Sequence, residues 1–141
     1  MTERPGLRGA LRASTAASAT PYGYTITTWA SGTLTATQIG APHLLEVLLF
    51  IAGAATAFVL VEGAAHGTAG VLDPAPAPPP VPLVAHGHWL SAGGAVVLVW
   101  AADRIIDARA AWLAAGFVAT GAYLLLGALQ TTIAARRAAD G

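Results

Sequence analysis

Four long stretches of this chain contain no Asp, Glu, Lys or Arg, and they constrain its fold more than any other feature. They are residues 13–45, 47–61, 74–102 and 110–135 of a chain of 141 residues. A bilayer core of about 30 Å is crossed by about 20 helical residues. Charged residues make up only 10% of the chain, against about 25% in an average soluble domain. A soluble globule of this composition could not cover its surface, so we expect an all-α integral membrane protein.

The composition also excludes several classes of function. Seven basic residues, all arginine, balance seven acidic ones, so the net charge is zero and no basic face is available for nucleic acid. The absence of cysteine excludes disulfides, zinc–thiolate sites, iron–sulfur clusters and cysteine nucleophiles. The sequence also lacks a phosphate-binding glycine loop, a zinc-protease motif and a nucleophile elbow. We therefore expect no enzymatic activity and no cofactor.

Three segments have the length and apolarity of membrane-spanning helices: residues 43–65, 83–102 and 110–135. The first two are joined by the segment 70–82, which holds six of the nine prolines. We expect this segment to form an extended connector at one membrane surface. The short connection 102–109 predicts that the last two helices form an antiparallel hairpin.

The N-terminal third allows two interpretations. After a basic segment, 1–12, the uncharged residues 13–37 could form a helix kinked at Pro21. Thr, Ser and Trp residues also alternate with period two from Thr25 to Thr37, which is typical of a hairpin or a re-entrant segment and would leave three spans. Because an open hairpin edge cannot face lipid, we favour the helix. The expected fold is then one membrane domain, 1–141, formed by a small bundle of four helices.

The arginines indicate how such a bundle is oriented. With four spans, five arginines lie on the side of the two termini and two lie on the other side. Because arginine is enriched in cytoplasmic segments, the N-terminus of this multi-pass protein of the cell membrane is expected in the cytoplasm. A three-span arrangement with a cytoplasmic N-terminus also places five arginines inside and two outside, so the rule does not decide between three and four spans.

Two carboxyl groups lie near the ends of the helix at 43–65. Glu46 and Glu62 are 16 residues apart, or about 24 Å along an α-helix. Glu46 shares a helix face with Gly53, Ala57 and Ala64, so we expect it to be the buried one, as a proton or cation site or as a structural hydrogen-bonding group. Glu62 lies roughly opposite at the helix end, where it can extend to the interface.

The last helix has one small and polar face, which we expect to point inward. Its residues could line a permeation path through Tyr123 and Gln130, or they could form a close-packed seam between helices. Leucine and phenylalanine lie away from this face. The inward set is Gly116, Ala119, Thr120, Tyr123, Gly127 and Gln130, and the outward set is Leu113, Phe117, Leu124 and Leu125.

Three histidines are expected at one membrane surface. His66 closes the second helix and His86 and His88 open the third, with Glu62 one turn before His66, whereas His43 lies at the opposite surface. The cluster could act as a pH-sensing gate, could bind metal or haem, or could consist of ordinary interfacial histidines. The spacing is not specific to a metal site, and we expect no bound metal.

Two classes of function remain. In the first, a homo-oligomer forms a channel or transporter for a small solute or ion, lined by Glu46, Tyr123 and Gln130 and gated by the histidines. In the second, the chain is a non-conducting accessory or scaffolding subunit that binds other membrane subunits. Binding of metal or haem by His66, His86 and His88 is a further alternative. We favour the transport hypothesis on the sequence, because burying Glu46 in a membrane is costly and a scaffold would have no need of it.

Overall fold

The computed structural model describes residues 7–70 and 88–139, and the side chains of 21–65, 88–108 and 110–137. The described chain forms four helices and contains no strand: α1 (Leu7–Ile39), α2 (Leu44–Gly70), α3 (His88–Asp103) and α4 (Ala108–Ala139). The four-helix prediction is therefore confirmed, and the hairpin alternative for the N-terminal third is wrong. The proline-rich connector predicted at 70–82 lies, after Gly70, outside the described residues.

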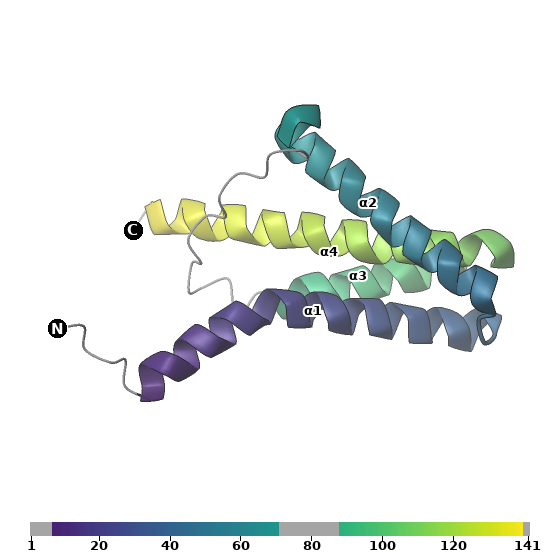
Figure 1. Ribbon diagram of the computed structural model, residues 1–141, viewed down its shortest axis with the longest axis horizontal. Coiled ribbons are helices and arrows are strands. Elements are labelled where there is room, and N and C mark those ends of the chain that lie inside the picture. The colour runs from purple at the N-terminus through teal and green to yellow at the C-terminus, as the bar shows by residue number, and fades with distance from the viewer. Residues whose placement is uncertain (1–6, 71–87, 140–141) are drawn as a thin grey trace.

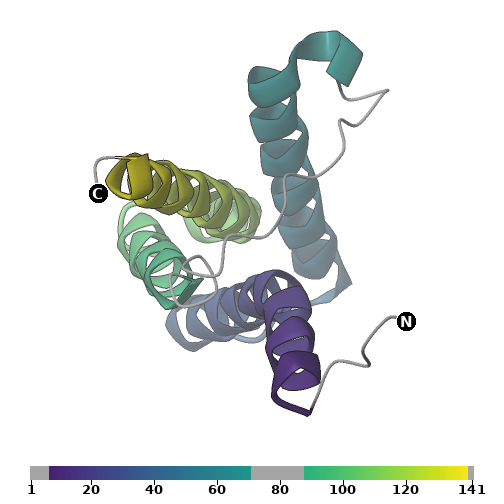
Figure 2. The same ribbon diagram turned by 90° about the vertical axis from the view of Figure 1, so that its left-hand side faces the viewer.

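α4 is the central helix of the bundle. It packs against α1, α2 and α3, and α1 also packs against α3. Figure 1 shows α1, α3 and α4 running side by side while α2 crosses α4 obliquely. In the end view of Figure 2, α2 stands apart from α3, on the other side of α4. Both short connections lie at one end of the bundle, and both termini lie at the other end (Figure 1).

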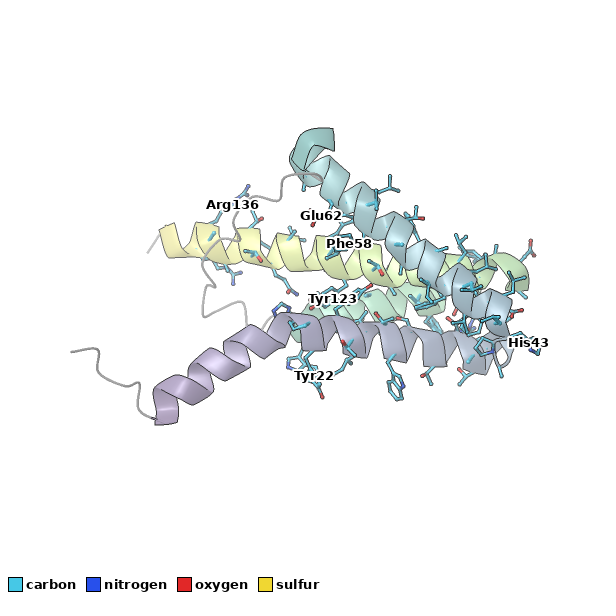
Figure 3. The ribbon with its side chains drawn as sticks, in the orientation of Figure 1. Tyr22, His43, Phe58, Glu62, Tyr123 and Arg136 are labelled. Carbon is cyan, nitrogen blue, oxygen red and sulfur yellow. The ribbon has the colours of Figure 1, made fainter. Side chains whose placement is uncertain are left out.

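α1 continues through a proline. Pro21 lies inside the helix, where it removes one backbone hydrogen bond and crowds the preceding turn. Figure 1 shows the first part of α1 bending away from the bundle, and Figure 3 places Tyr22 next to this bend. The predicted kink is therefore present, within one helix that is longer than the predicted 13–37.

The connection between α1 and α2 follows the rules of helix capping. Gly40 has a φ of 110°, and its N–H donates to the carbonyl of Ala36 at 2.9 Å, which ends α1. His43 then precedes the first residue of α2, and its N–H donates to the Glu46 carboxylate at 2.9 Å. A glutamate three residues after the cap that binds the cap's own N–H forms one half of a capping box, whose other half would be a Ser or Thr side chain at the position of His43. Glu46 therefore stabilises the start of α2.

The crossing of α2 and α4 depends on two glycines. A Cβ atom built on Gly53 would collide with the main-chain oxygen of Leu113, and one built on Gly116 would collide with the main-chain oxygen of Phe50. The two backbones are therefore in direct contact, as small residues allow in packed membrane helices. One turn along α2, Ala57 is also buried. The predicted small-residue face of this helix is confirmed at Gly53 and Ala57 but not at Ala64, which is exposed.

The interior of the bundle is made mostly of small and hydroxyl-bearing side chains, with Trp112 and Tyr123 as large buried exceptions, while most large apolar side chains point outward. The largest side chains that are fully buried are Val99, Thr27, Thr35, Thr120, Ser31 and Ser91. By contrast, leucine, isoleucine, valine, phenylalanine and tryptophan side chains are exposed along α2, α3 and α4. The usual distribution in a soluble protein is the reverse. Within the part of the chain that the structure describes, two helical segments, Leu44–Ala65 within α2 and Ala110–Arg137 within α4, are long and apolar enough to cross a membrane.

Candidate functional site

A stripe of hydroxyl side chains on α1 is buried in the bundle. Thr27, Ser31 and Thr35 recur every four residues and are all fully buried. The Thr27 hydroxyl donates to the carbonyl of Gly23 at 2.8 Å, which satisfies it within its own helix. The Ser31 hydroxyl has no hydrogen-bond partner in the structure. A buried polar atom without a partner is unusual and points to a ligand, a bound water or a functional role.

Asp103 joins α3 to this stripe. The Thr35 hydroxyl donates to Asp103 Oδ2 at 2.8 Å, and the Gln38 amide donates to the same oxygen at 3.4 Å. Arg104 Nε in turn donates to Gln38 Oε1 at 3.1 Å, and its guanidinium lies 4.6 Å from the centre of the Trp100 ring. The second carboxylate oxygen, Asp103 Oδ1, is buried and has no partner. A carboxylate thus fastens α1 to α3 with only one of its two oxygens.

The environment of Asp103 affects its ionisation. This residue is the last of α3, just beyond the segment 83–102 that is predicted to span a membrane. Burial raises the pKa of the Asp103 carboxyl above its usual value of 3.8, and the hydrogen bond from Thr35 partly offsets this rise. Desolvation disfavours the charged form, whereas a donor to the carboxylate favours it.

A second polar cluster joins α1, α3 and α4 nearer the other end of the bundle. Tyr24 and Thr120 share a hydrogen bond of 3.0 Å between their hydroxyl groups. Tyr123 and His88 Nδ1 share another, of 3.3 Å, and their rings are stacked. Gly23 makes room for this arrangement, because a Cβ atom there would come within 2.7 Å of the Tyr123 hydroxyl. These contacts hold the three helices together and order Tyr123 (Figure 3).

The predicted lining residues are placed in three different settings. Tyr123 is buried in the cluster just described, and Gln130 is half-buried further along α4. Glu46 is half-buried in the first turn of α2, bound to the backbone of His43. The expectation that Glu46 is buried against the small-residue face is therefore corrected, because its side chain turns back to cap its own helix. The structure does not bring Glu46 and Tyr123 together: Glu46 is bound to His43 at the start of α2, and Figure 3 shows His43 at one end of the bundle and Tyr123 nearer its middle.

The inward face predicted for the last helix is largely confirmed. Gly116, Ala119, Thr120 and Tyr123 are buried, and Gly127 is half-buried. Of the side chains expected to point outward, Leu113, Phe117 and Leu125 are exposed, but Leu124 is half-buried and packs against the cluster formed by Ala92, Ala95 and Tyr123. Because α4 is the central helix and packs against three others, more of its circumference is buried than the single stripe that was predicted.

Of the three histidines predicted to cluster, the structure describes the side chain of His88 alone. His88 is half-buried at the start of α3, bound to Tyr123. His66 lies in α2, but its side chain and the whole of His86 are outside the described part of the chain. Glu62 is half-buried on α2, and Figure 2 shows α2 and α3 on different sides of α4. Among the described residues, no three His, Cys, Asp or Glu side chains are grouped as metal ligands.

Asp103 and its partners were not foreseen in the sequence. Thr35 and Asp103 are 68 residues apart, and nothing local links them. One signal was available: Thr27, Ser31 and Thr35 follow the four-residue spacing of a single helix face. Comparisons of the chain with protein-family models, with curated proteins and with solved structures found no match.

Proposed function

We propose that this chain is an integral membrane protein whose four helices cross the bilayer, and that it acts as a non-conducting subunit of a membrane assembly. Insertion into the bilayer is supported by the distribution of polar and apolar side chains between the interior and the surface. Alanine and hydroxyl-bearing side chains make up most of the interior, and most large apolar side chains lie on the outside. In water such an exterior would aggregate. In lipid, helices pack through small residues and interhelical hydrogen bonds, as these helices do.

The orientation follows from the arrangement of the chain ends. Both termini lie at the same end of the bundle (Figure 1), and five of the seven arginines belong to the two terminal segments. By the positive-inside rule, this end faces the cytoplasm. The short connections 40–43 and 104–107 then lie on the outer side of the cell membrane.

We favour a non-conducting role over transport because the expected burial of Glu46 in the membrane was the reason to expect transport. A half-buried carboxylate that caps its own helix needs no pore to explain it. The other polar side chains of the interior are small, fully buried and mostly hydrogen-bonded, as in a packed seam between helices. A channel or transporter formed between several copies of the chain is the second candidate, with Tyr123 and Gln130 on its central helix.

A role in an assembly is supported by the outer face of α1. The side chains of Thr25, Trp29, Thr33 and Thr37 are exposed on this helix, and α1 is not one of the two helices apolar enough to cross a membrane by composition. A helix of this kind is held in a bilayer more easily when protein covers its polar side. Other membrane subunits or further copies of this chain could provide that cover.

Two experiments test the proposal. Alkaline carbonate extraction of membranes should leave the chain in the pellet, and release into the supernatant would contradict membrane insertion. Purified chain in sealed liposomes should carry no flux of Na⁺, K⁺ or H⁺ above that of protein-free liposomes under an imposed gradient. A flux that disappears in a Tyr123→Phe, Gln130→Ala variant would instead establish the transport function.

A further inference from the structure

The guanidinium of Arg104 is held in one orientation although the residue is exposed. Arg104 lies in the connection between α3 and α4, at the end of the bundle that holds both short connections (Figure 1). Its Nε donates to Gln38 Oε1 at 3.1 Å, and its central carbon lies 4.6 Å from the centre of the Trp100 ring. One edge and one face of the guanidinium are therefore fixed by neighbours from α1 and α3.

The charge of Arg104 is not paired with a carboxylate in the part of the chain that the structure describes. Asp103 Oδ2 accepts from Thr35 and Gln38 instead. Asp107 is exposed in the same connection and forms no ion pair with Arg104. The two terminal nitrogens of the guanidinium remain available, and such a pair binds a phosphate through two parallel hydrogen bonds.

The side chains on both sides of this cation are large, apolar and exposed. Trp100, one turn before Arg104, is 44% exposed, and Ile105, the next residue, is 85% exposed. The inference drawn here rests on the proposed membrane insertion, which places the end of α3 at a bilayer surface. Indole rings gather at that depth, and an arginine extends from there to the headgroups. A ligand that suits both the cation and its surroundings has an anionic head and apolar chains.

From these observations we propose that Arg104, Trp100 and Gln38 form a binding site for the phosphate of an anionic phospholipid. The terminal nitrogens of Arg104 bind the phosphate oxygens, Gln38 holds Nε, and Trp100 and Ile105 contact the acyl chains. A headgroup that carries an ammonium is disfavoured, because Arg104 repels it and already covers one face of the Trp100 ring that could bind it. Since Gln38 belongs to α1, the site is complete only when α1 is packed against α3.

The test uses the fluorescence of Trp100 in the full chain, reconstituted into phosphatidylcholine vesicles. Trp29, Trp89 and Trp112 are first replaced by phenylalanine, which leaves one tryptophan. The vesicles contain either phosphatidylglycerol or phosphatidylcholine with acyl chains brominated near the headgroup, since bromine quenches an indole that it contacts. We expect brominated phosphatidylglycerol to quench Trp100 at the lower mole fraction. One arginine attracts an anionic lipid by charge about fivefold, so the oriented guanidinium should give a larger preference.

Three variants separate the oriented site from attraction by charge. Arg104→Gln should abolish the preference. Arg104→Lys should reduce it to about fivefold, because lysine keeps the charge but cannot donate two parallel hydrogen bonds. Arg136→Gln is the matched control: it removes the same charge from an exposed position on α4, far from the connections (Figure 3), and should keep the preference of the parent. If the single-tryptophan chain does not fold, native mass spectrometry should show one more bound phosphatidylglycerol on the parent than on Arg104→Gln.

The possible results distinguish this site from its alternatives. Potassium phosphate, compared with potassium chloride at equal ionic strength, should leave quenching by brominated phosphatidylglycerol unchanged. A loss of quenching specific to phosphate would assign the position to a free anion and would overturn the proposal, as would an undiminished preference in Arg104→Lys. Equal quenching by the two brominated lipids would overturn it while leaving membrane insertion intact, whereas no quenching by either lipid would contradict membrane insertion itself.

Discussion

Replacing Gly116 by alanine should weaken the contact between α2 and α4. The new Cβ atom would meet the main-chain carbonyl of Phe50, which cannot rotate away as a side chain could. The two helices must separate, and the buried residues next to the crossing, including Ala57 and Trp112, lose contacts. Overpacking of this kind costs about 1–3 kcal/mol.

A matched substitution in the same helix isolates this effect. Gly127 has no atom near the position of its missing Cβ, so Gly127→Ala should only gain helix propensity, about 0.8–1.0 kcal/mol. The same gain opposes the clash in Gly116→Ala. The two variants should therefore differ in stability by about the full overpacking cost of 1–3 kcal/mol, with Gly116→Ala the less stable.

The assay is reversible unfolding in mixed micelles, followed by circular dichroism and by tryptophan fluorescence. Trp112 is 5% exposed and lies edge-on to Phe50 across the crossing, with ring centroids 6.5 Å apart. In a background where the other tryptophans are replaced by phenylalanine, its emission should shift to longer wavelength in Gly116→Ala before the helices unfold. Equal stability of the two alanine variants, with unchanged Trp112 emission, would refute the direct backbone contact.

Three further predictions concern the polar contacts. Glu46→Gln should unfold like the parent chain because glutamine can also complete a capping box, whereas Glu46→Ala should lose about 0.5–1.5 kcal/mol; equal losses in the two variants would count against the cap. A double-mutant cycle of Tyr24→Phe with Thr120→Val should give a coupling of about 0.6 kcal/mol, and strict additivity would mean that the bond contributes nothing. The raised pKa of Asp103 means that the folded chain holds this proton more tightly than the unfolded chain does. The contribution of this proton to stability is therefore greatest below pH 3.8, falls as pH rises to the folded pKa and is level above it. The dependence of Tm on pH should differ between the parent and Asp103→Asn by this fall, and parallel profiles would contradict it.

The helices themselves could be predicted from the sequence because each depends on local features. Absence of charge marked the apolar segments, and a spacing of three or four residues marked the inward face of α4. The alternation in α1 was ambiguous for a geometric reason. A step of two residues turns a helix by about 200°, so Thr27, Ser31 and Thr35 fall on one face and Thr25, Thr33 and Thr37 on the opposite one. Each face recurs every four residues, but the two faces together occupy every second position, which is the period of a strand.

The site could not be predicted, because it depends on which helices are neighbours. Thr35 meets Asp103 only when α1 packs against α3, and no local pattern encodes that pairing. The burial expected for Glu46 was wrong because the periodicity placed the side chain on a face without considering the backbone N–H of His43. That free N–H at a helix start attracts a carboxylate more strongly than a distant neighbour does.

The central claim is that four helices cross the membrane, with both short connections on one side and both termini on the other. The chain contains no cysteine, so single cysteines can be introduced without background. Cysteines at the exposed positions Ala41, Ile105 and Ala135 should be tested with an impermeant thiol reagent on intact cells and after permeabilisation. We predict that positions 41 and 105 react in intact cells and position 135 only after permeabilisation. Labelling of positions 41 and 105 from opposite sides of the membrane would contradict the four-span fold.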